Sequence, residues 1–114
     1  MSKFAIVVRY SSGSWARMLQ TVDDRTAAAR SLIESLSGSL EHVYWAADMR
    51  DAFAIAELPD STVGAAIAAA MTKTGAFTSV EVRELLTQDQ LTDVRQLAAT
   101  ASTFFVVPGV AAEA

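Results

Sequence analysis

The chain has 114 residues, of which 52% are hydrophobic, and nine Lys and Arg against thirteen Asp and Glu give a formal net charge of -4. This length suits one domain with its own core and leaves no room for a separate catalytic module. An acidic chain without a basic cluster is a poor partner for nucleic acid. Because the chain has no cysteine, a disulfide framework and a thiolate nucleophile are excluded, and zinc or iron-sulfur sites are disfavoured.

The N-terminal segment has none of the features of a targeting signal. Residues 3–10 form a short strand-like run that is interrupted by Arg9 and followed by the polar residues Ser11, Ser12 and Gly13. We therefore expect neither a signal peptide nor a membrane span, and we expect a cytoplasmic protein.

In chain order, four segments with strand character alternate with segments of helical spacing. The first strand is apolar on both sides, which is typical of a central strand. Between the elements, Ser14 is the candidate cap of a short helix, and Gly38 and Gly75 are expected to end the two longer helices, Gly38 in a left-handed conformation. The predicted strands are residues 4–10, 40–47, 52–58 and 77–86, and the predicted longer helices are residues 23–37 and 61–74.

The C-terminal part begins with a capping-box pattern, Thr87 followed by Gln90, which predicts a third helix that closes the core fold. The hydrophobic run at residues 103–109 is expected to pack across its own sheet or onto a partner chain. We therefore predict one domain over residues 1–102 and a hydrophobic extension over residues 103–114.

The order strand, helix, two strands, helix, strand predicts an α+β fold of the ferredoxin-like β-α-β-β-α-β type. Its four-stranded antiparallel sheet has helices on one face, so the other face meets water, a ligand or a second copy of the chain. With Val80 and Val82 placed toward the helices, small alanines on a central strand are expected to leave a depression in the helix-free face. The residues assigned to that face are Phe4, Ile6, Val8, Tyr10, His42, Tyr44, Ala52, Ala54, Ala56, Ser79, Glu81 and Arg83.

His42 is the only histidine and is predicted to share a strand face with Tyr44. An imidazole beside a phenol suits proton transfer without a cofactor, so these two residues are the candidate catalytic pair. The alternative interpretation is an edge-strand histidine and an ordinary interface tyrosine.

Ligand-binding candidates are the other residues assigned to this face that could hold a small molecule. Glu81 and Arg83 can pair with each other within one chain or across a dimer axis. Alternatively, they anchor an anionic ligand. Asp48 and Asp51 are too few ligands for a hard metal ion, so we predict no metal and no cofactor. The ligand-binding candidates are Tyr10, Ala54, Ala56, Glu81 and Arg83.

The segments Val8-Arg9-Tyr10, residues 44–47 and Glu57-Leu58-Pro59-Asp60 resemble the GYD domain family, and the likeness extends over about residues 3–90. The resemblance implies a small bacterial or archaeal protein with a ferredoxin-like fold, related to the dimeric α/β barrel superfamily, in a family without a generally assigned activity. Where that family has Gly-Glu-Tyr-Asp, this chain has residues 48–51, Asp-Met-Arg-Asp, so only Asp51 is kept. A role tied to the signature tyrosine does not carry over.

The resemblance also implies that two sheets meet through their helix-free faces in a homodimer or a larger even oligomer. The predicted function is that of a small-molecule-binding or structural interaction module. Its expected partners are further copies of the same chain and an apolar or anionic small molecule. The alternative is a small cofactor-independent oxygenase or isomerase with a pocket around His42 and Tyr44. The sequence leaves open which of these holds, and it names no ligand or reaction.

Overall fold

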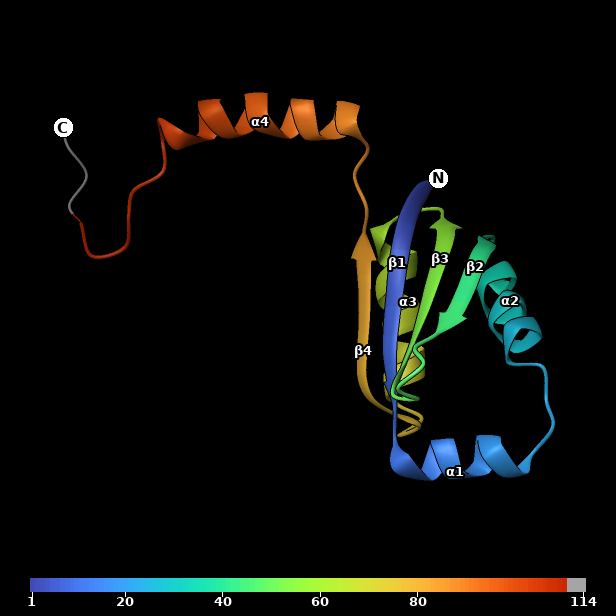
Figure 1. Cartoon of the computed structure of the whole chain (residues 1–114). Coiled ribbons are helices and arrows are strands. Elements are labelled where there is room, and N and C mark those ends of the chain that lie inside the picture. Colours follow the sequence, from blue (N-terminus) through green and yellow to red (C-terminus); the bar gives the residue numbers. More distant parts are fainter. Residues whose placement is uncertain (111–114) are drawn as a thin grey trace.

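The computed structural model describes residues 1–110 and shows a sheet with helices against one of its faces (Figure 1). The last four residues of the predicted extension lie outside the described residues. The strands are β1 (Ser2–Tyr10), β2 (Ser39–Trp45), β3 (Asp51–Leu58) and β4 (Phe77–Glu84). The helices are α1 (Ser12–Gln20), α2 (Arg25–Ser35), α3 (Ser61–Thr72) and α4 (Gln88–Ser102).

The four strands form one antiparallel sheet in the order β2-β3-β1-β4. This order, with β1 and β3 in the centre, confirms the predicted ferredoxin-like arrangement. Only β2 and β3 are joined by a hairpin turn. The pairs β1–β3 and β1–β4 join strands that are distant in the sequence and that helices separate along the chain.

Side-chain caps explain where the helices begin. A cap oxygen accepts a hydrogen bond from a backbone N–H that the helix itself leaves unpaired. Asp24 accepts from Ala27 N at 3.0 Å at the start of α2, and Thr87 and Gln90 form the predicted capping box of α4. The cap of α1 is Ser11 rather than Ser14, because the helix begins earlier than the sequence indicates.

The hydrophobic core lies between the sheet and the two helices α2 and α3. Ile33 of α2 and Ile67 of α3 belong to the same buried cluster as the side chains of β1 and β3, so both helices cover the same face. In Figure 1, α3 lies behind the strands and α2 lies beside β2. The buried members of the cluster are Phe4, Ile6, Val8, Ile33, Ala52, Ala56, Leu58 and Ile67.

The strand register corrects the predicted assignment of faces. Residues directly opposite each other in an antiparallel pair lie on the same side of the sheet. Ile6 is opposite both Ala54 on β3 and Val82 on β4, so all three face the helices. The placement of Val80 and Val82 is confirmed, and the placement on the helix-free face is wrong for Phe4, Ile6, Val8, Tyr10, Ala52, Ala54 and Ala56.

A bulge in β2 changes the predicted alternation of that strand. The register shifts between Leu40 and His42, so Leu40 is opposite Ala56 and His42 is opposite Ile55. A bulge inserts one extra residue and returns the following side chains to the other face. Leu40 therefore faces the helices, while His42 and Tyr44 lie together on the helix-free face as predicted.

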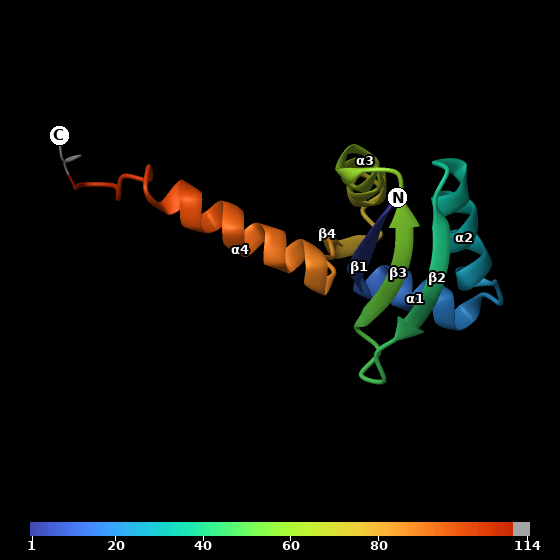
Figure 2. The same cartoon turned by 90° about the horizontal axis from the view of Figure 1, so that it is seen from above.

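The helix α4 does not close the core, which contradicts the prediction. It extends away from the sheet (Figure 2), and no residue of α4 is buried within the part of the chain that the structure describes. The molecule consequently measures 66 × 31 × 25 Å along its principal axes. Residues 103–110 continue outward and do not pack across their own sheet, so only the partner-chain alternative stays a prediction.

Gly38 has a steric role rather than the predicted conformational one. The left-handed residue after α2 is Ser37, with φ of 64°, and Gly75, with φ of 73°, has this conformation after α3. A Cβ atom at Gly38 would lie 2.8 Å from the carbonyl oxygen of Glu57 and 2.8 Å from the side chains of Ile33 and Leu58. Only glycine fits where the chain enters β2 this close to β3.

We predict that Gly38→Ala destabilises the fold by about 1–3 kcal/mol, because the added methyl group meets rigid backbone as well as two core side chains. Gly13→Ala is the matched control, since its Cβ would have only an ordinary contact at 3.6 Å from the Arg17 side chain. Urea unfolding of both variants measures the two effects. Equal stability of the two variants would contradict the close approach at Gly38.

Candidate ligand cavity and helix-free face

A cavity of about 290 Å³ lies between α2, α3 and the centre of the sheet. The helix α2 packs against β2 and α3 packs mainly against β4, which leaves the middle of the sheet uncovered between them. Alanines at Ala28 and Ala29 of α2 and at Ala70 of α3 face this space, and their short side chains do not fill it. The volume is close to the lower end of the range found for small-molecule sites.

The cavity wall is almost entirely apolar. Its floor is formed by central-strand residues such as Ile6, Val8 and Ala54, and its sides include Leu40 and Met71. A dry, apolar wall favours a ligand whose body is hydrocarbon or aromatic, because burial of apolar surface contributes roughly 25 cal/mol per Å².

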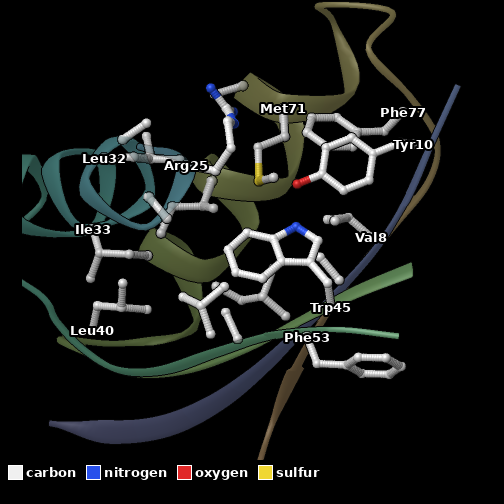
Figure 3. A pocket seen from close by; sticks show the side chains of 18 of the residues that line it. Val8, Tyr10, Arg25, Leu32, Ile33, Leu40, Trp45, Phe53, Met71 and Phe77 are labelled. Atoms are coloured by element: carbon white, nitrogen blue, oxygen red, sulfur yellow. The ribbon is translucent and has the colours of Figure 1, made fainter. Parts of the chain in front are cut away.

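Three polar side chains mark one end of this cavity. Figure 3 shows the hydroxyl group of Tyr10 pointing into the space between Met71 and the indole ring of Trp45, with the indole nitrogen on the same side. The guanidinium group of Arg25 lies at the rim and points away from the centre. Tyr10 is held by aromatic contacts to Trp15 and Phe77, with ring centroids 4.9 Å and 5.2 Å away.

Arg25 is the first residue of α2, directly after the Asp24 cap, which fixes its position at the rim. One guanidinium nitrogen bonds the Asp23 carboxylate at 3.2 Å. Its Nε atom is buried and has no hydrogen-bond partner among the residues that the structure describes. An unpaired buried donor costs free energy, so Arg25 has unused capacity for an acceptor at the cavity rim.

The five predicted ligand-binding residues do not form one site. Tyr10 and Ala54 line the cavity, and Ala56 is completely buried beside it in the core. Glu81 and Arg83 lie on the opposite, helix-free face, where each is opposite a residue of β1 that faces away from the helices. The prediction of a depression in the helix-free face is wrong, because the central alanines face the helices and border the cavity on that side.

The helix-free face has an apolar centre formed by two central strands. Val7 of β1 is opposite Phe53 of β3, and Ala5 is opposite Ile55. His42 and Tyr44 of β2 flank this centre, with their rings stacked at a centroid distance of 6.0 Å. The predicted pair is thus adjacent, and both side chains are exposed in the single chain and lie across the sheet from the cavity.

Ion pairs lie beside the apolar centre. Lys3 bonds Glu41 at 3.2 Å, and Arg83 bonds Glu81 at 3.1 Å. The second distance confirms the predicted pairing of these two residues within one chain and leaves their predicted contact with a ligand untested. All four side chains are partly exposed, so each pair contributes little to stability.

Asp51, the one retained signature residue, pairs with Arg9 at the start of β3. Arg9 donates from Nε to Oδ1 at 2.9 Å and from a terminal nitrogen to Oδ2 at 3.3 Å. These hydrogen bonds lower the pKa of Asp51, and the same hydrogen bonds raise the pKa of Arg9. The two-point contact joins β1 to the hairpin and gives Asp51 a structural role.

Sequence reasoning placed only Tyr10 and Ala54 of the cavity residues in a ligand site, and it missed Arg25, Trp45 and Met71 among the others. Trp45 and Met71 had the spacing of core residues, and nothing in a single sequence distinguishes a core side chain from one that borders a gap. The alanines at residues 28, 29 and 70 are the available signal, because short side chains leave space between a helix and a sheet.

The metal-binding side chains of residues 1–110 are dispersed over the structure. Within this range, no three His, Asp or Glu side chains gather closely enough to hold a metal ion. None of the helices described there combines the length and the apolar character required to cross a membrane.

We predict that Asp51→Asn lowers stability at neutral pH and that its cost disappears in acid. The pKa of Asp51 is lower in the folded than in the unfolded chain, so its contribution is fully present above about pH 4 and is lost as the pH falls through the folded value. Urea unfolding at several pH values should show that the difference in the free energy of unfolding between this variant and the native protein disappears below about pH 4. Asp93→Asn on α4 is the control, and a gap at Asp51 that is independent of pH would contradict the role of the carboxylate.

Comparison with known proteins identifies the family. The family model of the GYD domain matches residues 4–94, which include most of β1, the whole of β2, β3 and β4, and the Arg9–Asp51 pair. A search of curated proteins gave no match. The matched range ends within α4, so the last part of that helix and residues 103–110 lie beyond it. Because the match covers most of the sequence, the chain belongs to the GYD domain family.

Proposed function

We propose that this GYD domain protein is a homodimer that binds a small molecule in the cavity between α2, α3 and the sheet. The observation that supports this proposal is the cavity itself: about 290 Å³, apolar on its walls, with polar groups gathered at one end. Few, convergent polar groups in an apolar concavity are typical of small-molecule sites.

The chemistry of the lining favours a ligand with an apolar body and an anionic group at one end. The apolar body is buried against the central strands, while the Tyr10 hydroxyl and the Trp45 indole N–H can donate hydrogen bonds to the anionic group. Arg25 at the rim pairs with a carboxylate, sulfonate or phosphate group, for which a guanidinium is well suited. Asp23 competes for the same guanidinium, so the gain from this contact is moderate.

The helix-free face is the proposed interface with the second copy. Phe53 and Tyr44 are 41% and 64% exposed in the single chain, and they adjoin Val7 and Ile55 in one apolar area. A contiguous apolar area rimmed by polar residues is characteristic of an interaction surface. Binding on one face of the sheet and self-association on the other are therefore compatible.

A second candidate function is supported by the stacking of His42 on Tyr44. If a partner encloses this pair, the imidazole can exchange a proton with a substrate next to the phenol, as a cofactor-independent enzyme requires. The pair is separated from the cavity by the sheet, so this activity needs a second site built at the dimer interface.

We predict that the protein binds 8-anilino-1-naphthalenesulfonate, an aromatic dye with one sulfonate, and that Ala70→Leu weakens binding about tenfold or more, equivalent to about 1.4 kcal/mol. The larger side chain enters the cavity at a position that is exposed on α3, so the fold should tolerate it. Dye fluorescence measures the affinity. Arg25→Gln should also reduce it, by about tenfold, through loss of the charged contact.

Ala69→Leu is the matched control, because Ala69 is also exposed on α3 but does not line the cavity. It should bind the dye as the native protein does. Equal dye affinity for the variants at residues 69 and 70 would refute the cavity as the binding site.

For the second candidate, we predict that His42→Ala and Tyr44→Phe leave folding nearly intact, because both side chains are exposed in the single chain. Thermal unfolding and native mass spectrometry measure stability and subunit number. A large loss of stability or of the dimer would show that the pair has a structural role and would sink its catalytic assignment.

A further inference from the structure

We infer that α4 and residues 103–110, together called the arm, lie across the helix-free face of a second copy of the chain, in a reciprocal exchange. This inference rests on the proposed self-association through that face, and it names the element that covers it. It adds an interaction surface outside the ligand cavity, and it concerns residues that lie mostly beyond the family match.

The arm presents a continuous apolar stripe that its own chain does not cover. Leu91, Val94, Ala98 and Ala101 follow one another at intervals of three and four residues, which places them on one side of α4, and Phe105 follows four residues later, beyond the end of the helix. In helices, such a stripe is normally buried against another element. Here no α4 residue is buried within the described chain, so the stripe is unpartnered.

The amount of exposed apolar surface is larger than a single chain normally leaves in water. Phe104 and Phe105 are 81% and 70% exposed, and Leu97 is 70% exposed. Aromatic side chains bury roughly 150–250 Å² each, so the two phenyl rings alone approach the roughly 300–600 Å² of the largest apolar patch on a typical monomer. Reciprocal exchange uses two arms and two faces, which brings the buried area toward the roughly 1,600 Å² of a standard interface.

The dimensions of the arm and of the face agree. At about 1.5 Å per residue, the 15-residue helix α4 is about 22 Å long. The nine residues of β1 extend over roughly 30 Å at about 3.3 Å per residue. A helix about 10 Å wide covers two neighbouring strands, and the apolar centre of the face is two strands wide, β1 and β3.

The charges around that centre favour a helix as occupant, in place of the second sheet that the resemblance to dimeric α/β barrels implies. The cations Lys3, Arg9 and Arg83 are each paired with a carboxylate, and these pairs stand at the ends and one side of the apolar centre. A flat sheet laid on this face would take the ion pairs out of water, at a cost that their attraction does not recover. A narrow helix along the centre covers the apolar residues and leaves the pairs hydrated.

The start of the arm directs it away from its own sheet. Leu85 N donates to Lys3 O at 2.8 Å, which fixes the chain one residue beyond β4. Only Leu86 then separates this fixed point from Thr87, whose capping box sets the first turn of α4. The resulting outward direction, seen in Figures 1 and 2, places the stripe where another copy can receive it.

The chain has no cysteine, so single introduced thiols test the inference directly. Val94→Cys marks the arm, Val7→Cys marks the helix-free face, and Ala28→Cys marks the cavity side of the sheet as the control. Isotope-labelled Val94→Cys protein is mixed with each unlabelled partner variant and treated with a short bismaleimide. Mass spectrometry then distinguishes mixed pairs, which can form only between two chains.

We expect the mixed pair of residues 94 and 7 to form and the mixed pair of residues 94 and 28 to be absent. A cross-link of residue 94 only to residue 28 would place the arm in the partner's cavity. A cross-link only between the residues 94 of two chains would indicate that two α4 helices pair with each other. Each of these results overturns the inference. Cross-linking of 7 only to 7 would overturn the arm exchange while supporting the proposed self-association through the face. If no interchain pair forms and residues 94 and 7 are cross-linked only when both cysteines stand in the same chain, the arm returns to its own sheet, which also overturns the inference.

A second comparison uses charge at matched positions of α4. Val94→Asp places a carboxylate in the stripe, and Gln96→Asp places one on the opposite side of the same helix. Native mass spectrometry should show at least a tenfold weaker dimer for the first variant and an unchanged dimer for the second. Equal dimers would refute the exchange, while dye binding by both variants reports separately on the cavity.

Discussion

The antiparallel register of β1 with its two neighbours is the constraint on which the rest of this structure depends. Ile6 lies opposite Ala54 on one side and Val82 on the other, so one residue fixes the orientation of three strands. A slip of one residue would exchange the two faces and expose the core. The Arg9–Asp51 pair joins β1 to β3 where β3 begins, and Gly38 allows β2 to approach β3 closely where β2 begins.

Two surfaces of different chemistry follow from this one alternation. On the helix side, the short alanines of the central strand and of both helices leave a cavity that the core does not fill. On the other side, Val7, Phe53 and Ile55 form an apolar centre with ion pairs at its ends and along one side. The proposed ligand and the proposed partner therefore use opposite faces of the same sheet.

The sequence was sufficient for the fold and its local signals: element order, the capping box at Thr87 and the sharing of one face by His42 and Tyr44. Those features depend on neighbouring residues. Which side of β1 faces the helices depends on pairing between strands that are distant in sequence. Both sides of β1 are apolar, so the alternation of its residues does not distinguish the two sides. The bulge after Leu40 and the outward direction of α4 likewise depend on backbone geometry, which residue type does not determine.

The central claim is that the sheet separates a ligand side from a partner side. Alanine methyl groups report on both, because Ala29, Ala54 and Ala70 line the cavity while Ala5 lies on the helix-free face. Titration of alanine-methyl-labelled protein with 8-anilino-1-naphthalenesulfonate, followed by NMR, should shift the three cavity methyl signals and leave that of Ala5 in place. A shift at Ala5 with an unchanged Ala54 would contradict the account, because the ligand would then bind the face assigned to the partner.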